Sequence, residues 1–253
     1  MTALGAVSGP DDGVIDFSDA AALRELSGGE LLNEWGLVRM RGFGPLADNW
    51  RLLPDSLGID PEAVDYAITV GASLNRVTTL VGGQDESAVR TAAQAAGWSD
   101  GDVLRHDLDG EQQLTMLYGW IAPEGDTVVF GGRQAETGGD PASDDPDVHA
   151  IAACLGDVVA AFFMPSAAVG LLPVGGDEAV SVYCVLGDEA AAASIEHELA
   201  TGVSAFSGRA YAELFPEQTV AESDGVVRVE LSAGPGPLDT VIQMLRRGEL
   251  PAG

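Results

Sequence analysis

The fold is decided by the stretch that opens with Val77-Thr78-Thr79-Leu80-Val81 and continues into Asp85-Glu86. This pattern is typical of a short apolar strand followed by a helix that begins at an aspartate N-cap. A second opening of the same kind follows as Val182-Tyr183-Cys184-Val185-Leu186 and then Asp188-Glu189. The two openings together predict an internal repeat with a spacing of about 100 residues.

Working outward from Val77, we expect the order strand, helix, strand, strand, helix, strand as far as Met164. That is the order of the split βαβ, or ferredoxin-like, motif. From Val180 the order starts again. The sequence therefore predicts an α+β fold of two ferredoxin-like lobes, each an antiparallel sheet with helices on one face.

The predicted boundaries follow from these two lobes. They are a flexible lead at 1–16, an N-terminal segment at 17–76, the first lobe at 77–165, a linker at 166–176 and the second lobe at 177–253. The N-terminal segment is expected to form helices at Ser18–Leu26 and Asp60–Ile68 and a strand at Leu37–Arg41. We expect this strand to complete the second lobe, whose last strand is otherwise missing.

Helix ends and turns are the clearest local signals. Apolar stripes bounded by start and stop residues predict four helices, at Asp85–Gly97, Asp145–Gly156, Asp188–Gly202 and Pro237–Gly248. The segment Pro123-Glu124-Gly125-Asp126 predicts a hairpin turn. The continuous apolar run Val158–Met164 is typical of a central strand.

The charge excludes several classes of function. The 253-residue chain carries 40 acidic and 12 basic residues, a formal net charge of −28, and all of its basic residues are arginine. Such a surface repels nucleic-acid backbones and anionic membranes. Without lysine there is neither a P-loop lysine nor a Schiff-base lysine. We therefore expect no nucleic-acid partner.

The two cysteines, Cys154 and Cys184, leave two interpretations open. They form either one disulfide in an oxidising compartment or two buried thiols. A zinc site shared with His149 is disfavoured, because structural zinc needs four ligands in close pairs and the chain has no CxxC motif. We expect no cofactor.

Catalytic signatures are weak. Glu196-His197-Glu198 lacks the second histidine of a zincin helix, and His197 is expected on the exposed face of its helix. The candidate serine nucleophiles do not lie in a GxSxG turn; they are Ser166, Ser204 and Ser207. The remaining enzymatic hypothesis is a reaction that uses carboxylates such as Glu196 or Asp107.

One acidic segment resembles a metal-binding motif but also has a purely structural interpretation. Asp107, Asp109 and Glu111 resemble part of a calcium loop, but the glutamate that an EF-hand requires is replaced by Met116. We interpret them as an acidic turn and keep calcium-dependent adhesion as an alternative function.

The segment Gly42-Phe43-Gly44-Pro45-Leu46-Ala47 partly matches GxGxxA. Pro45 removes a backbone N–H that a phosphate would need, so a dinucleotide site is not expected. Trp35 and Trp50 flank the predicted Leu37–Arg41 strand and are the candidates for exposed recognition residues.

Four segments carry a resemblance to a known group. They are Leu52–Pro61, Val81–Asp85, Val128–Gly132 and Asp145–Val159. In these the chain resembles the mature part of uncharacterised exported lipoproteins of high-GC Gram-positive bacteria. The resemblance implies an envelope location and a lipid-modified cysteine ahead of Met1, an anchor that this chain does not contain. It also favours the disulfide over free thiols.

The sequence therefore predicts a protein exported to the cell envelope or the extracellular space, and it favours a binding or scaffolding protein over an enzyme. We expect it to act through its acidic surface or a groove between its lobes. Its partner would be a protein or a small molecule, and it would meet a membrane only through the missing anchor.

Overall fold

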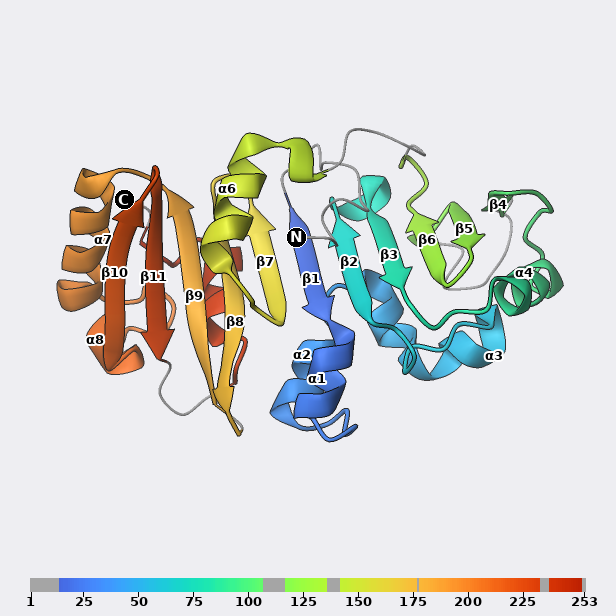
Figure 1. The fold of residues 1–253 in the computed structure, drawn as a ribbon, viewed down its shortest axis with the longest axis horizontal. Coiled ribbons are helices and arrows are strands. Elements are labelled where there is room, and N and C mark those ends of the chain that lie inside the picture. The colour runs from blue at the N-terminus through green and yellow to red at the C-terminus, as the bar shows by residue number, and fades with distance from the viewer. Residues whose placement is uncertain (1–13, 107–116, 136–141, 177, 233–236, 252–253) are drawn as a thin grey trace.

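All described strands belong to one antiparallel sheet. The computed structural model describes residues 14–106, 117–135, 142–176, 178–232 and 237–251 (Figure 1). The strands are β1 (Ile15–Asp19), β2 (Tyr66–Val70), β3 (Val77–Val81), β4 (Leu104–Arg105), β5 (Trp120–Glu124), β6 (Thr127–Gly131), β7 (Ala160–Met164), β8 (Ala167–Gly175), β9 (Glu178–Leu186), β10 (Glu217–Ser223) and β11 (Val226–Ser232). Their spatial order is β10-β11-β9-β8-β7-β1-β2-β3-β6-β5-β4.

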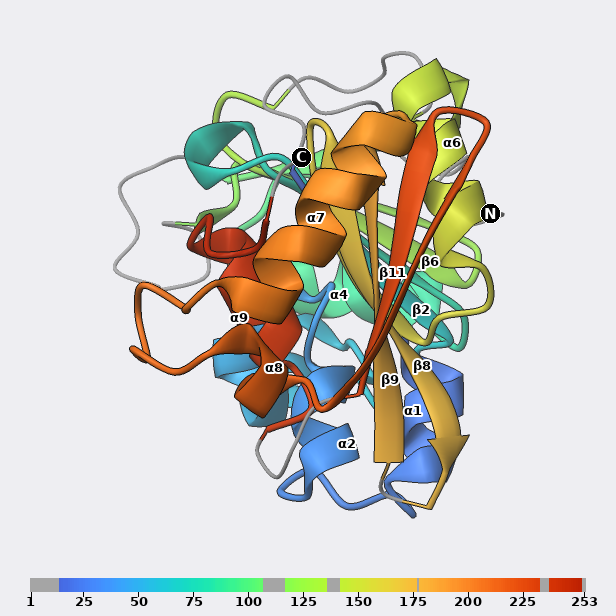
Figure 2. The ribbon, with the colours of Figure 1, turned by 90° about the vertical axis from the view of Figure 1, so that its left-hand side faces the viewer.

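The helices lie on both faces of this sheet. They are α1 (Ala20–Leu26), α2 (Glu34–Arg39), α3 (Leu53–Leu57), α4 (Glu86–Ala95), α6 (Pro146–Leu155), α7 (Glu189–Thr201), α8 (Tyr211–Leu214) and α9 (Thr240–Arg246), with 3-10 helices η2 (Gly44–Leu52), η3 (Ser73–Asn75) and η4 (Ala142–Asp144). One face packs against α1 to α4 and α7 to α9, and α6 covers part of the other (Figures 1 and 2). The expectation of helices on one face is therefore wrong.

The chain has the expected mixed α+β character, but the ferredoxin-like arrangement is not found. That arrangement needs the closing strand beside the opening strand, whereas β1 and β2 lie between β3 and β7. The halves also share one sheet, because β1 pairs with β7 in the register Ile15↔Phe163 and Phe17↔Ala161. From this seam outward, the order β1-β2-β3-β6-β5 in one half matches β7-β8-β9-β11-β10 in the other.

Several predicted elements are correct. The N-caps Asp85, Asp145 and Asp188 each accept hydrogen bonds from backbone N–H groups in the first turn of α4, α6 and α7. The hairpin joins β5 to β6, and β7 is a central strand as expected.

Other predicted elements are wrong. Residues 15 and 16 of the predicted lead belong to β1, and most of the predicted linker is β8. The predicted strand at Leu37–Arg41 overlaps α2. The predicted helices at Ser18–Leu26 and Asp60–Ile68 each contain strand residues, from the end of β1 and the start of β2.

A partly buried ion cluster ties β1 to α9 across the seam. Asp16 binds the Nε atom of Arg41 and the Nη2 atom of Arg246, each at 3.1 Å. Arg41 also contacts Asp239 at 3.3 Å, and the guanidinium of Arg246 lies 4.5 Å from the ring centroid of Phe162. The cluster thus joins residues 230 positions apart in the chain.

We predict that this cluster makes stability depend on pH. Burial raises the pKa of Asp16 above its ordinary value of 3.8. The positive charges of Arg41 and Arg246 lower the pKa, but their effect is smaller than that of burial. The native state therefore holds this proton to a higher pH than the unfolded chain does, so its contribution to stability falls as pH rises through the raised pKa. Asp16→Asn removes the titration, and the stability of wild type relative to this variant should increase from pH 7 to pH 4 in urea unfolding. Asp48→Asn, at an exposed position, is the control; equal slopes for both variants would contradict the assignment.

Candidate functional site

The candidate site is a hollow of about 280 Å³ on the α6 side of the sheet, at the seam between the halves. One wall comes from β1 and β2 and the other from β7, the end of α6 and the loop between them. The full lining is Phe17, Asp19, Tyr66, Ala152, Leu155, Gly156, Asp157, Val158, Val159, Ala161 and Phe163. The size suits a single side chain or a small molecule.

The alternation of side chains along β1 determines which of its residues line the hollow. In β1, Ile15, Phe17 and Asp19 point toward the α6 side, while Asp16 and Ser18 point toward the helical layer. Asp19 pairs with Tyr66 on β2, so the rings of Phe17 and Tyr66 lie diagonally across the two strands. They stack with centroids 6.3 Å apart and an interplanar angle of 18°. Tyr66 is 40% exposed, so part of this aromatic surface is open to a ligand.

The end of α6 forms the second wall. α6 packs through Val148, Ile151 and Leu155 and stops at Gly156, which has a φ of 72°. The helix therefore ends before it reaches the seam. The chain then turns through Asp157 into β7. The carbonyl of Val159, the residue before β7, accepts a hydrogen bond from the N–H of Asp19 at 2.8 Å.

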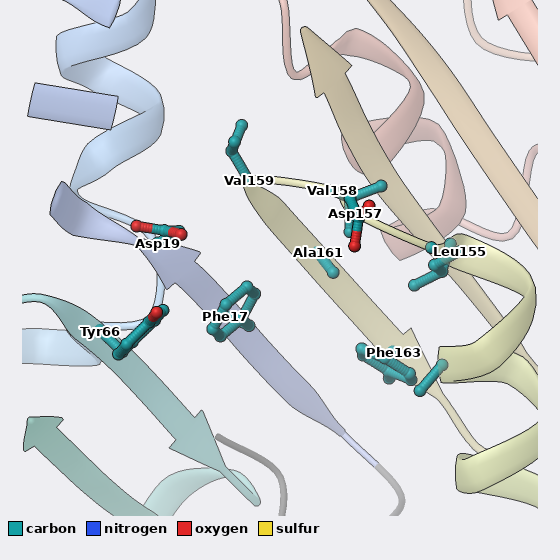
Figure 3. A pocket seen from close by; sticks show the side chains of 11 residues that line it. Phe17, Asp19, Tyr66, Leu155, Asp157, Val158, Val159, Ala161 and Phe163 are labelled. Atoms are coloured by element: carbon teal, nitrogen blue, oxygen red, sulfur yellow. The ribbon is translucent and has the colours of Figure 1, made fainter. Parts of the chain in front are cut away.

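Two carboxylates face each other across the hollow. Figure 3 shows Asp19 on the side of Tyr66 and Asp157 on the side of the helix end, with Phe17 and Ala161 on the neighbouring strands between them. Asp19 caps α1 by accepting from the N–H of Ala22 at 2.8 Å, and Asp157 is exposed. Within the described residues neither forms an ion pair, and no arginine lines the hollow.

This arrangement favours a cation that also carries an apolar part. A guanidinium or ammonium group gains from a carboxylate and from an aromatic face, while an anion would meet only repulsion. Phe163, Leu155 and Ala161 provide the apolar contact area. The hollow therefore has the chemistry of a binding site for an organic cation.

The cysteines form the disulfide. Cys154 on α6 and Cys184 on β9 are joined with an S–S distance of 2.03 Å. The pairing removes both thiols from any metal site, and the described residues contain no cluster of three or more potential metal ligands. His149 is exposed on α6.

The two candidate recognition tryptophans are buried. Trp35 has no exposed surface and its Nε1 atom donates to the carbonyl of Gly176 at 3.3 Å, so the expectation that it is exposed for recognition is wrong. Trp50 is 7% exposed and donates to Glu62 at 3.1 Å. Trp50 also lines a separate hollow together with Leu32 and Leu52. Both residues were misplaced because α2 and η2 turn them toward the core.

The other sequence candidates do not assemble into a site in the described chain. His197 and Glu196 are exposed on α7, and Ser166 and Ser207 are exposed in loops. Ser204 is buried, and its hydroxyl lies 3.1 Å from the carboxylate of Glu249. Asp107, Asp109 and Glu111 lie outside the described residues.

The glycines of the GxGxxA-like segment serve packing. Gly42 has a φ of 76°, and a Cβ there would lie 2.1 Å from the carbonyl oxygen of Ala67. A Cβ on Gly44 would lie 2.9 Å from the hydroxyl of Thr69. These glycines let the chain pass close over β2, and Phe43 between them is fully buried.

Four residues of the hollow are not among the site residues predicted from the sequence: Phe17, Asp19, Tyr66 and Asp157. Their local signal was the alternation of Ile15-Asp16-Phe17-Ser18-Asp19, which is typical of a strand. Pairing of β1 with β7 brings the residues together over a separation of about 140 positions, and that pairing has no local signal.

Fold and site together define a mixed α+β protein on a single antiparallel sheet, with an acidic, aromatic hollow at its centre. No protein-family model matches the chain, and no curated protein matches it. Among solved structures, crystal form III of TP0453 is similar, with 10% identity and a TM-score of 0.42 over 94% of this chain and 96% of that one.

Proposed function

We propose that this is a non-catalytic cell-envelope protein that binds a partner or small molecule through an organic cation seated in the hollow at the seam. The observation that carries the proposal is the convergence of Asp19, Asp157 and the Phe17–Tyr66 stack from both halves of the chain. A positively charged side chain of a partner protein fits this volume, as does a small aromatic amine.

The overall charge supports the same class of ligand. A net charge of −28 attracts cations over long range and raises their rate of encounter with the surface. Long-range attraction does not distinguish one cation from another. We expect the selectivity among cations to come from the hollow, because a cation there contacts aromatic and aliphatic side chains as well as carboxylates.

The disulfide supports a location outside the reducing cytosol. Cys154 and Cys184 are bonded in the structure, and stable disulfides are typical of exported proteins. In the described part of the chain, each helix is too short or too polar to cross a bilayer. An envelope location, with or without a lipid anchor, is the simplest setting for the proposed binding role.

We also infer that the two halves derive from an internal repeat. Each half has three successive strands, a helix, and a hairpin whose second strand returns beside the third. The strand orders match from the seam outward. In this interpretation the hollow lies where the two repeats join, a place that neither repeat would form alone.

The binding proposal predicts preference for a cation over its neutral isostere. The probe is 2-phenylethylamine, followed by amide NMR shifts, and 2-phenylethanol is the neutral match. We expect saturable shifts at Phe17, Ala161 and Asp157 with the amine and much weaker shifts with the alcohol. Asp157→Asn should weaken binding roughly fivefold, since one partly solvated carboxylate contributes about 1 kcal/mol.

Glu196→Gln on α7 is the matched control, because it removes the same charge from an exposed position away from the hollow. It should leave the affinity nearly unchanged. Equal binding of amine and alcohol, or equal weakening by Asp157→Asn and Glu196→Gln, would overturn the proposal.

A further inference from the structure

The strand β10 is a long open edge of the sheet. It pairs with β11 on one side, from Glu217↔Ser232 to Ser223↔Val226, and no described strand lies on its other side. It has seven residues, without proline or bulge. Figure 1 shows β10 as the outermost strand, next to α7, and Figure 2 views the molecule from that side. The opposite edge of the described sheet, β4, has two residues.

The geometry of the turn after β10 determines which backbone groups of β10 point away from β11. Asp224 and Gly225 have φ angles of 55° and 79°, as in a two-residue type I′ turn. Such a turn closes on a hydrogen-bonded pair, here Ser223 and Val226. Counting back by alternation, the N–H and C=O groups of Gln218, Val220 and Glu222 point to the open edge. Within the described chain these backbone groups have no bond besides those of the ladder.

The surroundings of the edge are acidic and have free space. Glu217 and Glu222 lie near its two ends, followed by Asp224 in the turn. On the α6 side, a hollow of about 350 Å³ is lined by the small side chains Ala150, Ala153 and Ala221. The hollow contains Arg228, whose charge is already paired with Glu230 at 2.9 Å.

We propose that β10 is a docking edge for an extended, positively charged segment of another protein, which adds to the sheet as a further strand. The outward backbone groups provide the hydrogen bonds, as in β-strand addition. Ala221 is a small residue of β10 on the α6 side and leaves room for a side chain of the added strand. Glu217 and Glu222 favour Arg or Lys on that strand. A second copy is a poor occupant because each chain carries a charge of −28.

This edge is separate from the seam hollow, since β8, β9 and β11 lie between β7 and β10. The edge can therefore be tested without disturbing the proposed cation site, and failure of one proposal does not imply failure of the other.

The test uses the full chain and a synthetic peptide, acetyl-Arg-Val-Arg-Val-Arg-Val-Arg-amide. The control peptide carries N-methyl groups on all seven residues, which keeps the charge and removes the backbone N–H groups from both edges of the strand. We expect the plain peptide to bind at least tenfold more tightly. Hydrogen exchange should slow at the amides of Gln218, Val220 and Glu222 when it binds.

Two variants complete the test. Val220→Pro removes one outward N–H that takes no part in the hydrogen-bond ladder with β11, and Glu217→Arg reverses one charge at the edge. Each variant should weaken peptide binding at least fivefold. A native circular dichroism spectrum shows that each variant is folded. Equal affinity for both peptides would show attraction by charge alone and overturn the proposal. Self-association that Val220→Pro abolishes would also overturn it, by making a second copy the occupant.

Discussion

Gly42→Ala is expected to destabilise the protein by about 2 to 5 kcal/mol. The substitution combines left-handed backbone strain of about 1 to 2 kcal/mol with overpacking of about 1 to 3 kcal/mol. The new methyl group would lie 2.1 Å from the carbonyl oxygen of Ala67 and 3.0 Å from the backbone nitrogen of Ser18. Neither backbone atom can move away freely, because both belong to central strands.

The surroundings of Gly42 cannot shift easily either. Its carbonyl accepts a hydrogen bond from the hydroxyl of Thr69 at 2.6 Å, and the hydroxyl of Ser18 lies 2.5 Å from the carbonyl of Arg41. These bonds hold the segment against β1 and β2. The variant must therefore break buried hydrogen bonds or displace a strand that lines the seam hollow.

Urea unfolding measures this loss, with Gly125→Ala as the matched control. Gly125 also has a left-handed backbone, with a φ of 61°, but a Cβ there meets no atom within 4 Å. The control should cost about 1 to 2 kcal/mol, from backbone strain alone. Equal losses for the two variants would mean that the close approach of Gly42 to β2 contributes nothing to stability.

Local chemistry explains which parts of the fold could be predicted from the sequence. Asp85, Asp145 and Asp188 are N-caps because a short acceptor satisfies free N–H groups within its own turn, and nothing distant is required. The same holds for the hairpin between β5 and β6. The predicted strand at Leu37–Arg41 was wrong: most of this segment belongs to α2, whose N-cap Asn33 accepts from the N–H of Gly36 at 2.8 Å.

The β8 strand shows why other parts could not be predicted. Its two glycines and its proline are typical of a linker. Gly170 nevertheless lies in a strand inside the sheet, where the side chain of Val158 fills the space that a Cβ would take. Pro173 is accommodated next to a register irregularity. Both exceptions depend on neighbours that the local sequence does not reveal.

The candidate site was beyond local prediction for the same reason. Each of its residues looks ordinary alone: Asp19 is a helix cap, Phe17 a strand residue and Asp157 a residue after a helix stop. Their proximity follows from the pairing of β1 with β7 and from the point at which α6 ends. The sequence-level expectation of a groove between lobes named none of these residues, and the use of such a groove for binding stays a prediction.

The double variant Cys154→Ala/Cys184→Ala should lose about 3.5 kcal/mol of stability. The disulfide closes a loop with a sequence separation of 30, and cross-linking a loop of this size restricts the unfolded chain by about that amount. It also fixes α6 on the sheet, since Cys184 is fully buried within the same apolar cluster as Ile151 and Leu155.

Loss of this link should affect the seam hollow as well as global stability, because Leu155, Gly156 and Asp157 follow Cys154 directly and form one wall. Urea unfolding gives the stability, and titration with 2-phenylethylamine should show weaker binding by the variant while Asp157 is still present. Reductant should destabilise wild type and leave the double variant unchanged, which separates the bond from the substitutions. Unfolding of reduced and oxidised wild type at the same urea concentration would contradict this prediction. The disulfide would then not hold α6 in place, and the shape of the hollow would depend on packing alone.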